Sequence, residues 1–184
     1  MIQKYAKDFV KTAFGGNKDK LEHFERTEYW VGQLKSNPSK ALLIAAYAYD
    51  IERAFNSDND FKRHLESCTD KAFLDKHQNE GGQTMSAVLI SKGADPKLAA
   101  EVQDLIAHHE VGGTPEQNVL KDADSIAYFE SNAQKHLAMV KENGISKELL
   151  KKKFDFMFNR ISSDYARSIV ELMYRKMIES LEKL

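Results

Sequence analysis

Histidines and carboxylates recur along this chain at spacings that suit metal binding. Of the six histidines among 184 residues, five lie near acidic side chains. In DKLEHFER, Asp19 and His23 are four residues apart and would share one face of a helix, with Arg26 on the adjoining ridge. Imidazole nitrogen and carboxylate oxygen are common ligands of transition metals. By itself the motif is weak, because a histidine near acids is usually only solvated.

Asp50 ends the most apolar segment of the chain, ALLIAAYAYD. Burying a carboxylate is costly unless it is paired, hydrogen-bonded or bound to a cation. We therefore interpret Asp50 as a metal ligand. The alternative is that the helix is emerging into solvent there and that Asp50 pairs with Arg53 or Arg63.

His77 lies one helical turn before two adjacent glycines, in KHQNEGG. Glycine inside a helix costs about 1 kcal/mol relative to alanine, so Gly81 and Gly82 need a structural reason. Close approach of another helix would supply one, and a break in the helix would supply another. The residues alone favour neither.

His108 and His109 are adjacent in LIAHHEVGG. Neighbouring residues point about 100° apart on a helix, so both can serve one centre only at a helix end or around more than one ion. Alternatively, the two histidines merely complement the negative end of a helix.

The last acidic candidate lies in NVLKDADSIAYFE. Asp124 follows Leu120 and Ala123 on the apolar face, whereas Asp122 points elsewhere. Asp124 is therefore the expected ligand of this segment.

The elements that carry these residues are all predicted to be helices. Almost every segment has the apolar spacing of an amphipathic helix, and none sustains the alternation of a strand, so we predict an all-α fold. Capping residues and glycines place helices over about 2–14, 18–34, 40–55, 70–92, 96–109, from 115, from 147, and 162–184. The expected N-caps are Asn17, Ser39, Thr69, Asp95, Thr114 and Ser146.

Composition limits the possible environments and partners. The length suits one domain, and the 42% hydrophobic and 30% charged residues are typical of a globular protein. A net charge of -1 gives no general field for nucleic acid, so we expect no nucleic-acid partner. Cys68 is the single cysteine, the N-terminal segment is too charged for a secretory signal, and residues 41–49 are too short to span a bilayer. We expect a cytoplasmic protein without membrane association.

Taken in order, these residues resemble the HD superfamily of metal-dependent phosphohydrolases over about residues 20–130. His23 with Arg26 matches the family's opening helix, and Asp50 in AAYAYDIER matches the acid of the name-giving His-Asp pair. The later ligands match His77 before Gly-Gly, His108-His109-Glu110, and Asp124. The resemblance implies a compact single-domain HD helical bundle over 1–184, with a metal-binding core at about 18–140 on which C-terminal helices at 146–184 pack.

The sequence departs from the HD pattern in two places. Tyr49 stands where the histidine of the His-Asp pair is expected, and VGGTPEQ lacks the Gly-Tyr-Pro that continues the cyclic-dinucleotide signature. We therefore expect a weak or empty first ion site. Alternatively, Tyr49 is a buried aromatic whose hydroxyl hydrogen-bonds Asp50 without any metal.

The resemblance implies one or two divalent transition-metal ions (Fe, Mn, Co, Ni or Zn). Asp50 would bridge them, with His23 and Asp124 on one ion and His77, His108 and His109 on the other. A water ionised between them would attack the phosphorus of a small phosphorylated substrate such as a nucleotide. Arg26 and Arg53 would contact the phosphate as catalytic residues, with Lys62, Arg63 and Lys71 as further candidates and the loop 56–60 as a gate.

Two other functions remain open on the same scaffold. Some members of the superfamily use paired iron to oxidise a small molecule, and Tyr49 is the main argument for a non-catalytic helical binding protein with a degenerate site. Metal content and a phosphatase screen would separate the three. The sequence indicates neither the substrate nor the oligomeric state.

Overall fold

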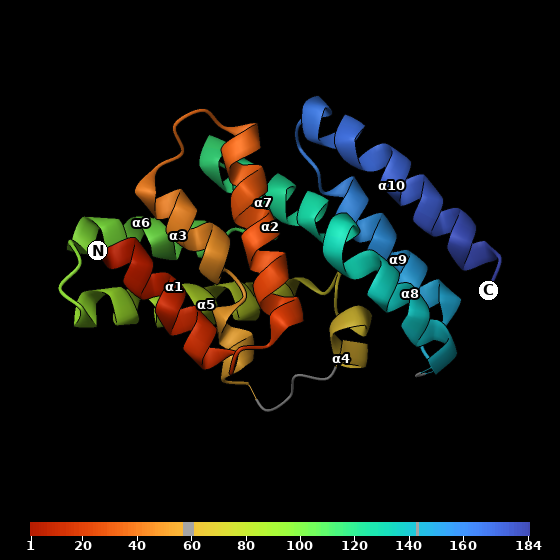
Figure 1. The fold of residues 1–184 in the computed structure, drawn as a ribbon, viewed down its shortest axis with the longest axis horizontal. Coiled ribbons are helices and arrows are strands. Elements are labelled where there is room, and N and C mark those ends of the chain that lie inside the picture. Colours follow the sequence, from red (N-terminus) through yellow and green to blue (C-terminus); the bar gives the residue numbers. More distant parts are fainter. Residues whose placement is uncertain (57–60, 143) are drawn as a thin grey trace.

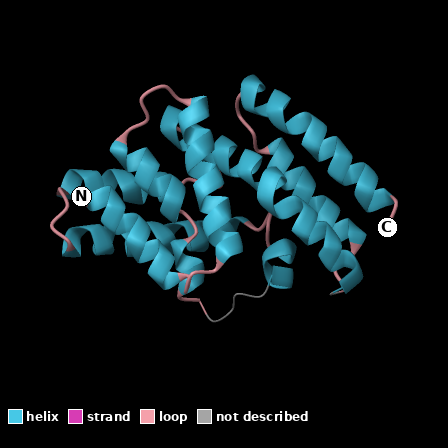
Figure 2. Ribbon diagram, viewed as in Figure 1, coloured by secondary structure: helices cyan, strands magenta, loops and turns pink. Residues whose placement is uncertain are grey.

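The computed structural model of the chain describes residues 1–56, 61–142 and 144–184. Within these ranges every regular element is a helix and no strand occurs (Figure 2). The prediction of an all-α fold is confirmed. The helices in chain order are α1 (Ile2–Ala13), α2 (Lys18–Leu34), α3 (Lys40–Ala48), η1 (Ile51–Ala54), α4 (Phe61–Glu66), α5 (Lys71–Ser91), α6 (Pro96–Ile106), α7 (Pro115–Ala127), η2 (Tyr128–Asn132), α8 (Ala133–Glu142), α9 (Lys147–Asn159) and α10 (Asp164–Glu182).

Most helices begin where a side chain caps them. The predicted N-caps Asn17, Ser39, Asp95, Thr114 and Ser146 each accept a hydrogen bond from a backbone N–H of the first turn, and Thr114 forms a full capping box with Gln117. The prediction at Thr69 was wrong by one residue. Asp70 caps α5 by accepting from the Phe73 N–H, so α5 begins at Lys71.

Two helices end earlier than their apolar spacing predicts, and both ends shape the site. The single helix expected over 40–55 stops at Ala48, and Asp50 lies in a turn before the short 3-10 helix η1. Likewise α6 ends at Ile106, so His109 lies in a turn rather than in the helix. Both side chains therefore project from helix ends. Helix α4 was not predicted, and residues 57–60 of the predicted gating loop lie outside the described residues.

Two hydrophobic clusters build the molecule. The first is formed mainly by α1, α2, α3, α5 and α6, and the second by η2, α8, α9 and α10. Helices α2 and α7 pack against each other between them (Figure 1). Helix α7 serves both clusters, because Leu120 lies in the first and Ile126 in the second. The candidate site lies at this junction and draws residues from both sides.

Helix α5 runs unbroken through Gly81 and Gly82. A Cβ at Gly81 would lie 3.2 Å from the Tyr49 carbonyl oxygen, and a Cβ at Gly82 would lie 2.7 Å from the Gln103 carbonyl oxygen. The two glycines therefore let α5 approach both the turn after α3 and helix α6. Close approach is confirmed, and the alternative of a helix break is wrong.

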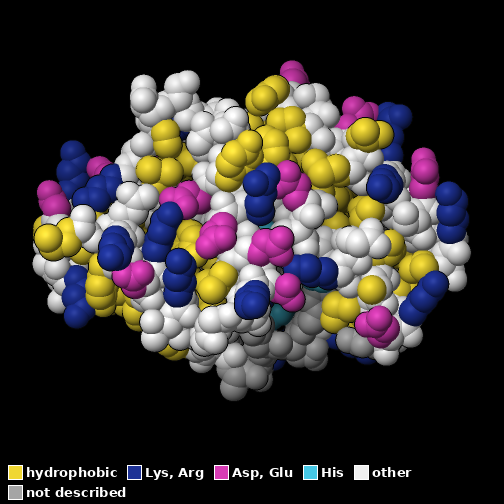
Figure 3. All heavy atoms as spheres, in the orientation of Figure 1, with side chains coloured by type: hydrophobic (Ala, Val, Ile, Leu, Met, Phe, Trp, Pro, Cys, Tyr) yellow, Lys and Arg dark blue, Asp and Glu magenta, His cyan; other side chains and the backbone are white. Residues whose placement is uncertain are grey.

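The surface carries both signs of charge. On the face shown in Figure 3, Lys and Arg side chains are interspersed with Asp and Glu over both ends of the molecule. This agrees with the net charge of -1. Among the described helices, none combines the length and apolar character that a bilayer crossing requires.

Candidate metal centre

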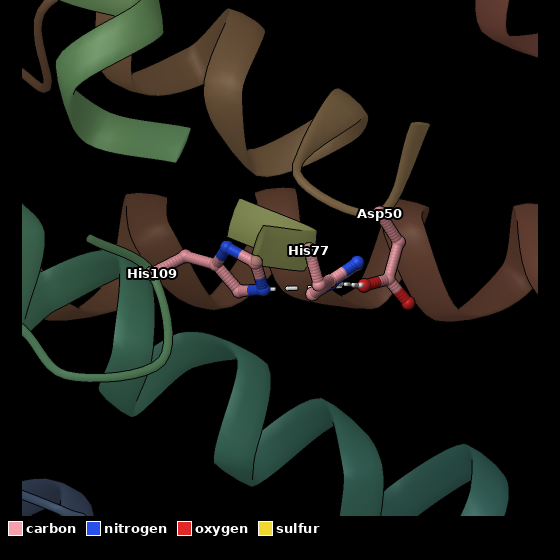
Figure 4. A group of neighbouring side chains, drawn as sticks. All are labelled: Asp50, His77 and His109. Atoms are coloured by element: carbon pink, nitrogen blue, oxygen red, sulfur yellow. Dashed lines mark hydrogen bonds and ion pairs between the residues drawn. The ribbon is translucent and has the colours of Figure 1, made fainter. Parts of the chain in front are cut away.

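Asp50, His77 and His109 converge from three elements on one point (Figure 4). Asp50 comes from the turn after α3, His77 from α5 and His109 from the turn after α6. The His77 Nε2 lies 3.1 Å from Asp50 Oδ1, and the His109 Nε2 lies 3.9 Å from the same oxygen. All three side chains are buried. They offer two imidazole nitrogens and one carboxylate oxygen, a donor set suited to a mid-series divalent metal.

His109 presents an unused lone pair. Its Nδ1–H donates to the Ile106 carbonyl oxygen at 2.8 Å, which fixes the proton on that nitrogen. Burial lowers the pKa of His109, so the ring is neutral and Nε2 is an acceptor. This Nε2 is fully buried and has no hydrogen-bond partner among the described residues. The His109 Nε2 lone pair and the nearby Asp50 carboxylate are both acceptors, so neither can donate a hydrogen bond to the other. A cation between them would bind to both.

His77 is oriented by a second carboxylate. Its Nδ1 lies 2.7 Å from Glu52 Oε2, on the opposite side of the ring from Asp50. Burial and Arg53 lower the pKa of His77, but hydrogen bonds to Asp50 and Glu52 outweigh them and raise it. A carboxylate that accepts from the Nδ1–H of a metal-binding histidine is a common outer support of such ligands. Glu52 is well placed for this role.

The residues of the expected first ion site are joined by Tyr49 instead. The Tyr49 hydroxyl donates to Asp124 Oδ1 at 2.8 Å and lies 2.7 Å from His23 Nε2. His23 and Asp124 are themselves 3.0 Å apart. Burial raises the pKa of Tyr49 well above its ordinary value, so the phenol stays protonated. Of the alternatives weighed for Tyr49, a buried hydroxyl used as a hydrogen-bond donor is correct, but its partner is Asp124 and not Asp50.

A guanidinium neutralises the same carboxylate. Arg160, the residue after α9, donates to Asp124 through Nη2 and to Glu110 through Nη1, while its Nε donates to Ser125 at 2.9 Å. Burial alone would raise the pKa of Asp124, but Arg160 and His23 hold it far below its ordinary value. The turn between α9 and α10 is held by Asp122. Its carboxylate accepts hydrogen bonds from the backbone N–H groups of residues 162 and 163 at 2.7 and 2.9 Å.

Asp50 also has a cationic partner. Arg53 Nε lies 3.0 Å from Asp50 Oδ2, on the carboxylate oxygen that does not face the histidines. The ion pair considered as an alternative from the sequence therefore exists beside the histidine cluster, and it leaves Oδ1 for a cation. The four carboxylates of Asp50, Glu52, Glu110 and Asp124 face the two guanidiniums of Arg53 and Arg160.

Several predicted residues lie elsewhere. His108 is 43% exposed and bonds to the Asp104 carbonyl oxygen at 2.8 Å. Arg26 is 37% exposed and pairs with Glu130 at 2.8 Å. Lys71 pairs with Asp75 on the surface. Of the five cations proposed for phosphate contact, Arg53 is the one that lines the cleft over Asp50.

Sequence reasoning named Glu110 only as part of the His-His-Glu motif, and it missed Glu52 and Arg160. Glu52 follows Asp50 by two residues, so local sequence could have suggested it. No local signal marks Arg160, which reaches the site across 36 positions from Asp124.

The residues present fit one ion rather than two. Asp50, His77 and His109 offer three ligand atoms close together, one of them a buried nitrogen without a hydrogen-bond partner among the described residues, and Glu52 supports His77 from outside. His23 and Asp124 are already satisfied by Tyr49 and Arg160.

Comparison with known proteins places the chain in a family. No match was found among curated proteins or among solved structures. The sequence matches the family described as "Domain of unknown function (DUF4202)" over residues 3–181, nearly its whole length. The chain therefore belongs to the DUF4202 family.

Proposed function

We propose that this protein is a metal-dependent phosphohydrolase that uses a single divalent ion held by Asp50, His77 and His109. The observation that carries the proposal is the buried His109 Nε2, which has no hydrogen-bond partner among the described residues and lies 3.9 Å from Asp50 Oδ1 and 3.7 Å from Glu110 Oε1. A bound divalent ion would supply a Lewis acid for a phosphoryl oxygen and would lower the pKa of a ligand water. The ester would be small, because the adjoining cleft has a volume of about 350 Å³.

The chain's own residues would position the reacting groups. Asp50 belongs both to the histidine cluster and to the cleft wall, so a substrate in the cleft would lie beside the ion. Arg53 holds Asp50 Oδ2 and lines the same cleft, where its guanidinium could contact a phosphate oxygen. Glu52 would keep the His77 ring in place.

The two adjacent histidines give a matched test of the metal site. Mn²⁺ or Zn²⁺ is titrated calorimetrically into the apo protein, and phosphate release is then assayed on a panel of phosphomonoesters. We expect one ion per chain, with binding lost in His109→Ala and kept in His108→Ala, whose side chain is exposed. If both variants bind the ion as the wild type does, the centre is misassigned. If the wild type binds the ion but releases no phosphate, the hydrolase assignment fails.

A second candidate is a non-catalytic binding protein, which the Tyr49 and Arg160 contacts favour. These two side chains satisfy His23 and Asp124 without an ion, so part of the inherited site would serve only the fold. A di-iron oxygenase would need a second ion at these same two residues, and we do not propose it. Metal binding without turnover would support the non-catalytic candidate.

A further inference from the structure

The cleft over Asp50 is lined by two lysines that form no ion pair with a carboxylate of the described residues. Lys20 of α2 and Lys153 of α9 both line it. Each carboxylate in the lining already has a cationic partner: Asp19 pairs with Lys135, Asp50 with Arg53, and both Glu110 and Asp124 with Arg160. Within the described ranges, no carboxylate oxygen lies within ion-pair distance of either ammonium group.

Neither lysine side chain is fully exposed to solvent. Both side chains are only partly exposed, and the Lys153 ammonium lies 5.5 Å from the Tyr128 ring centre and 5.2 Å from that of Phe156. Burial and repulsion from Arg53 and Lys153 lower the pKa of Lys20, and the attraction of Asp50 and Asp124 only partly opposes this. A partly buried ammonium without an ion-pair partner destabilises the folded protein, and an anion bound beside it would offset that cost.

Two histidines of the cleft also feel these cations. Burial and Arg53 lower the pKa of His64 to about 4 against the attraction of Asp50, and burial and Lys153 lower that of His136 to about 3. Lys20 contributes to both shifts. Besides its paired carboxylates, the cleft lining therefore holds cations from α2, η1 and α9, three elements distant in the sequence.

We propose that Lys20 and Lys153 form a subsite for the dianionic phosphate of a phosphomonoester. The inference rests on the proposed function, because Asp50 at the cleft floor would place that phosphate beside the ion. Two ammonium groups match the two charges of one terminal phosphate. The organic part would lie against the apolar lining of Leu65, Leu74, Met139 and Met157. Additional phosphates would meet Asp50, Glu110 and Asp124, so polyphosphates and dinucleotides fit poorly.

Direct binding of inorganic phosphate tests the subsite without relying on turnover. The full chain, stripped of metal by a chelator, is titrated calorimetrically near neutral pH. We expect Lys20→Met and Lys153→Met each to weaken phosphate binding by about tenfold or more. Lys135→Met is the matched control, because that lysine lines the same cleft but is paired with Asp19 and Glu22. Its affinity should stay within about twofold of the wild type.

Thermal melting separates a binding role from a structural one. Removing an unpaired, partly buried charge should leave the melting temperature of Lys20→Met and Lys153→Met equal to or above that of the wild type. Unchanged phosphate affinity in both variants, or a lowered melting temperature in both, would overturn the subsite. Dimethyl phosphate, a monoanionic diester, should bind more weakly than methyl phosphate, and equal binding would overturn the monoester assignment.

A Mn²⁺ titration of the same variants distinguishes the two proposals. Lys20→Met and Lys153→Met should bind the ion as the wild type does, because neither lysine belongs to the Asp50, His77 and His109 cluster. Loss of phosphate binding in a protein that binds no metal would support the subsite and contradict the metal centre. If the protein binds Mn²⁺ and both lysine variants bind phosphate as the wild type does, the metal centre is supported and the subsite is contradicted.

Discussion

The Tyr49 hydroxyl donates a hydrogen bond of 2.8 Å to Asp124, so a phenol satisfies a carboxylate that the sequence pattern assigned to a metal ion. The hydroxyl also lies 2.7 Å from His23 Nε2. Both partners are buried, and Asp124 has its remaining oxygen on Arg160. With Tyr49 at this position, His23, Asp124 and Arg160 form an internal hydrogen-bond network.

Replacing Tyr49 with phenylalanine should destabilise the protein. The buried Asp124 and His23 would lose a partner, which costs about 1–3 kcal/mol in the free energy of unfolding. Tyr47→Phe is the matched control two residues earlier, because the Tyr47 hydroxyl makes a longer bond of 3.4 Å to the exposed Glu25. Urea denaturation of both variants provides the measurement. If both variants lose the same free energy of unfolding, the hydrogen bonds of Tyr49 contribute no more to stability than that of Tyr47.

Replacing Tyr49 with histidine should not be sufficient to recruit a second ion. In Tyr49→His, Arg160 would still neutralise Asp124, so the metal content should remain at about one ion per chain. The double variant Tyr49→His/Arg160→Gln would free both Asp124 and Glu110, and its content should rise to about two. Elemental analysis of protein purified in the presence of Mn²⁺ checks both values. Two ions in the single variant would contradict the role given to Arg160.

The close contact of α5 with α6 should make Gly82 intolerant of a side chain. A Cβ there would lie 2.7 Å from the Gln103 carbonyl oxygen, a backbone atom, so α6 would have to move. We expect Gly82→Ala to cost about 1–3 kcal/mol. At Gly32, a helical position of α2 with nothing within 4 Å of a Cβ, alanine should stabilise by up to about 1 kcal/mol. Chemical denaturation measures the free energy of unfolding of both alanine variants. Similar changes at the two positions would contradict the proposed close contact of α5 with α6.

His136 should make the protein less stable in acid. Burial and the nearby Lys153, Lys20, His23 and Lys135 lower its pKa to about 3, from an ordinary value of 6.5. The unfolded chain therefore takes up this proton first as the pH falls. The contribution is complete above pH 6.5 and is lost between there and about 3, with a slope of at most about 1.4 kcal/mol per pH unit.

The variant His136→Gln isolates this contribution. It keeps a hydrogen-bonding group beside the Tyr128 hydroxyl, which lies 3.0 Å from His136 Nδ1, but it removes the titration. Free energies of unfolding measured at several pH values should fall less steeply in the variant than in the wild type. Parallel profiles would show that His136 does not titrate differently in the folded state.

Local sequence predicted the elements well, and it predicted the histidines and acids of the site in part. Capping residues such as Asn17 and Ser146 mark helix starts because their side chains satisfy N–H groups within one turn. Asp50 could be identified because a charge at the end of an apolar segment is costly to bury, and His77 because the two glycines after it are unfavourable inside a helix. The choice between His108 and His109 was not predictable, because it depends on α6 ending at Ile106, a consequence of tertiary packing.

The cations of the site could not be predicted in the same way. Lys153 lies in a basic amphipathic helix, and Arg160 follows it; the local pattern resembles an ordinary solvated surface. Their partial or full burial follows from how α9 packs beside α4, α8 and α10. Only the three-dimensional arrangement shows that Arg160 pairs with the carboxylates of α7 and of the turn after α6, and that Lys153 lines the cleft beside them.

The distance in sequence between Arg160 and its acidic partners has a consequence for incomplete chains. A chain that ends before residue 160 would contain Glu110 and Asp124 without the guanidinium that pairs with both. Burying carboxylates that have lost a charged partner is costly, so such truncated chains should be cleaved by proteases more readily than the full chain.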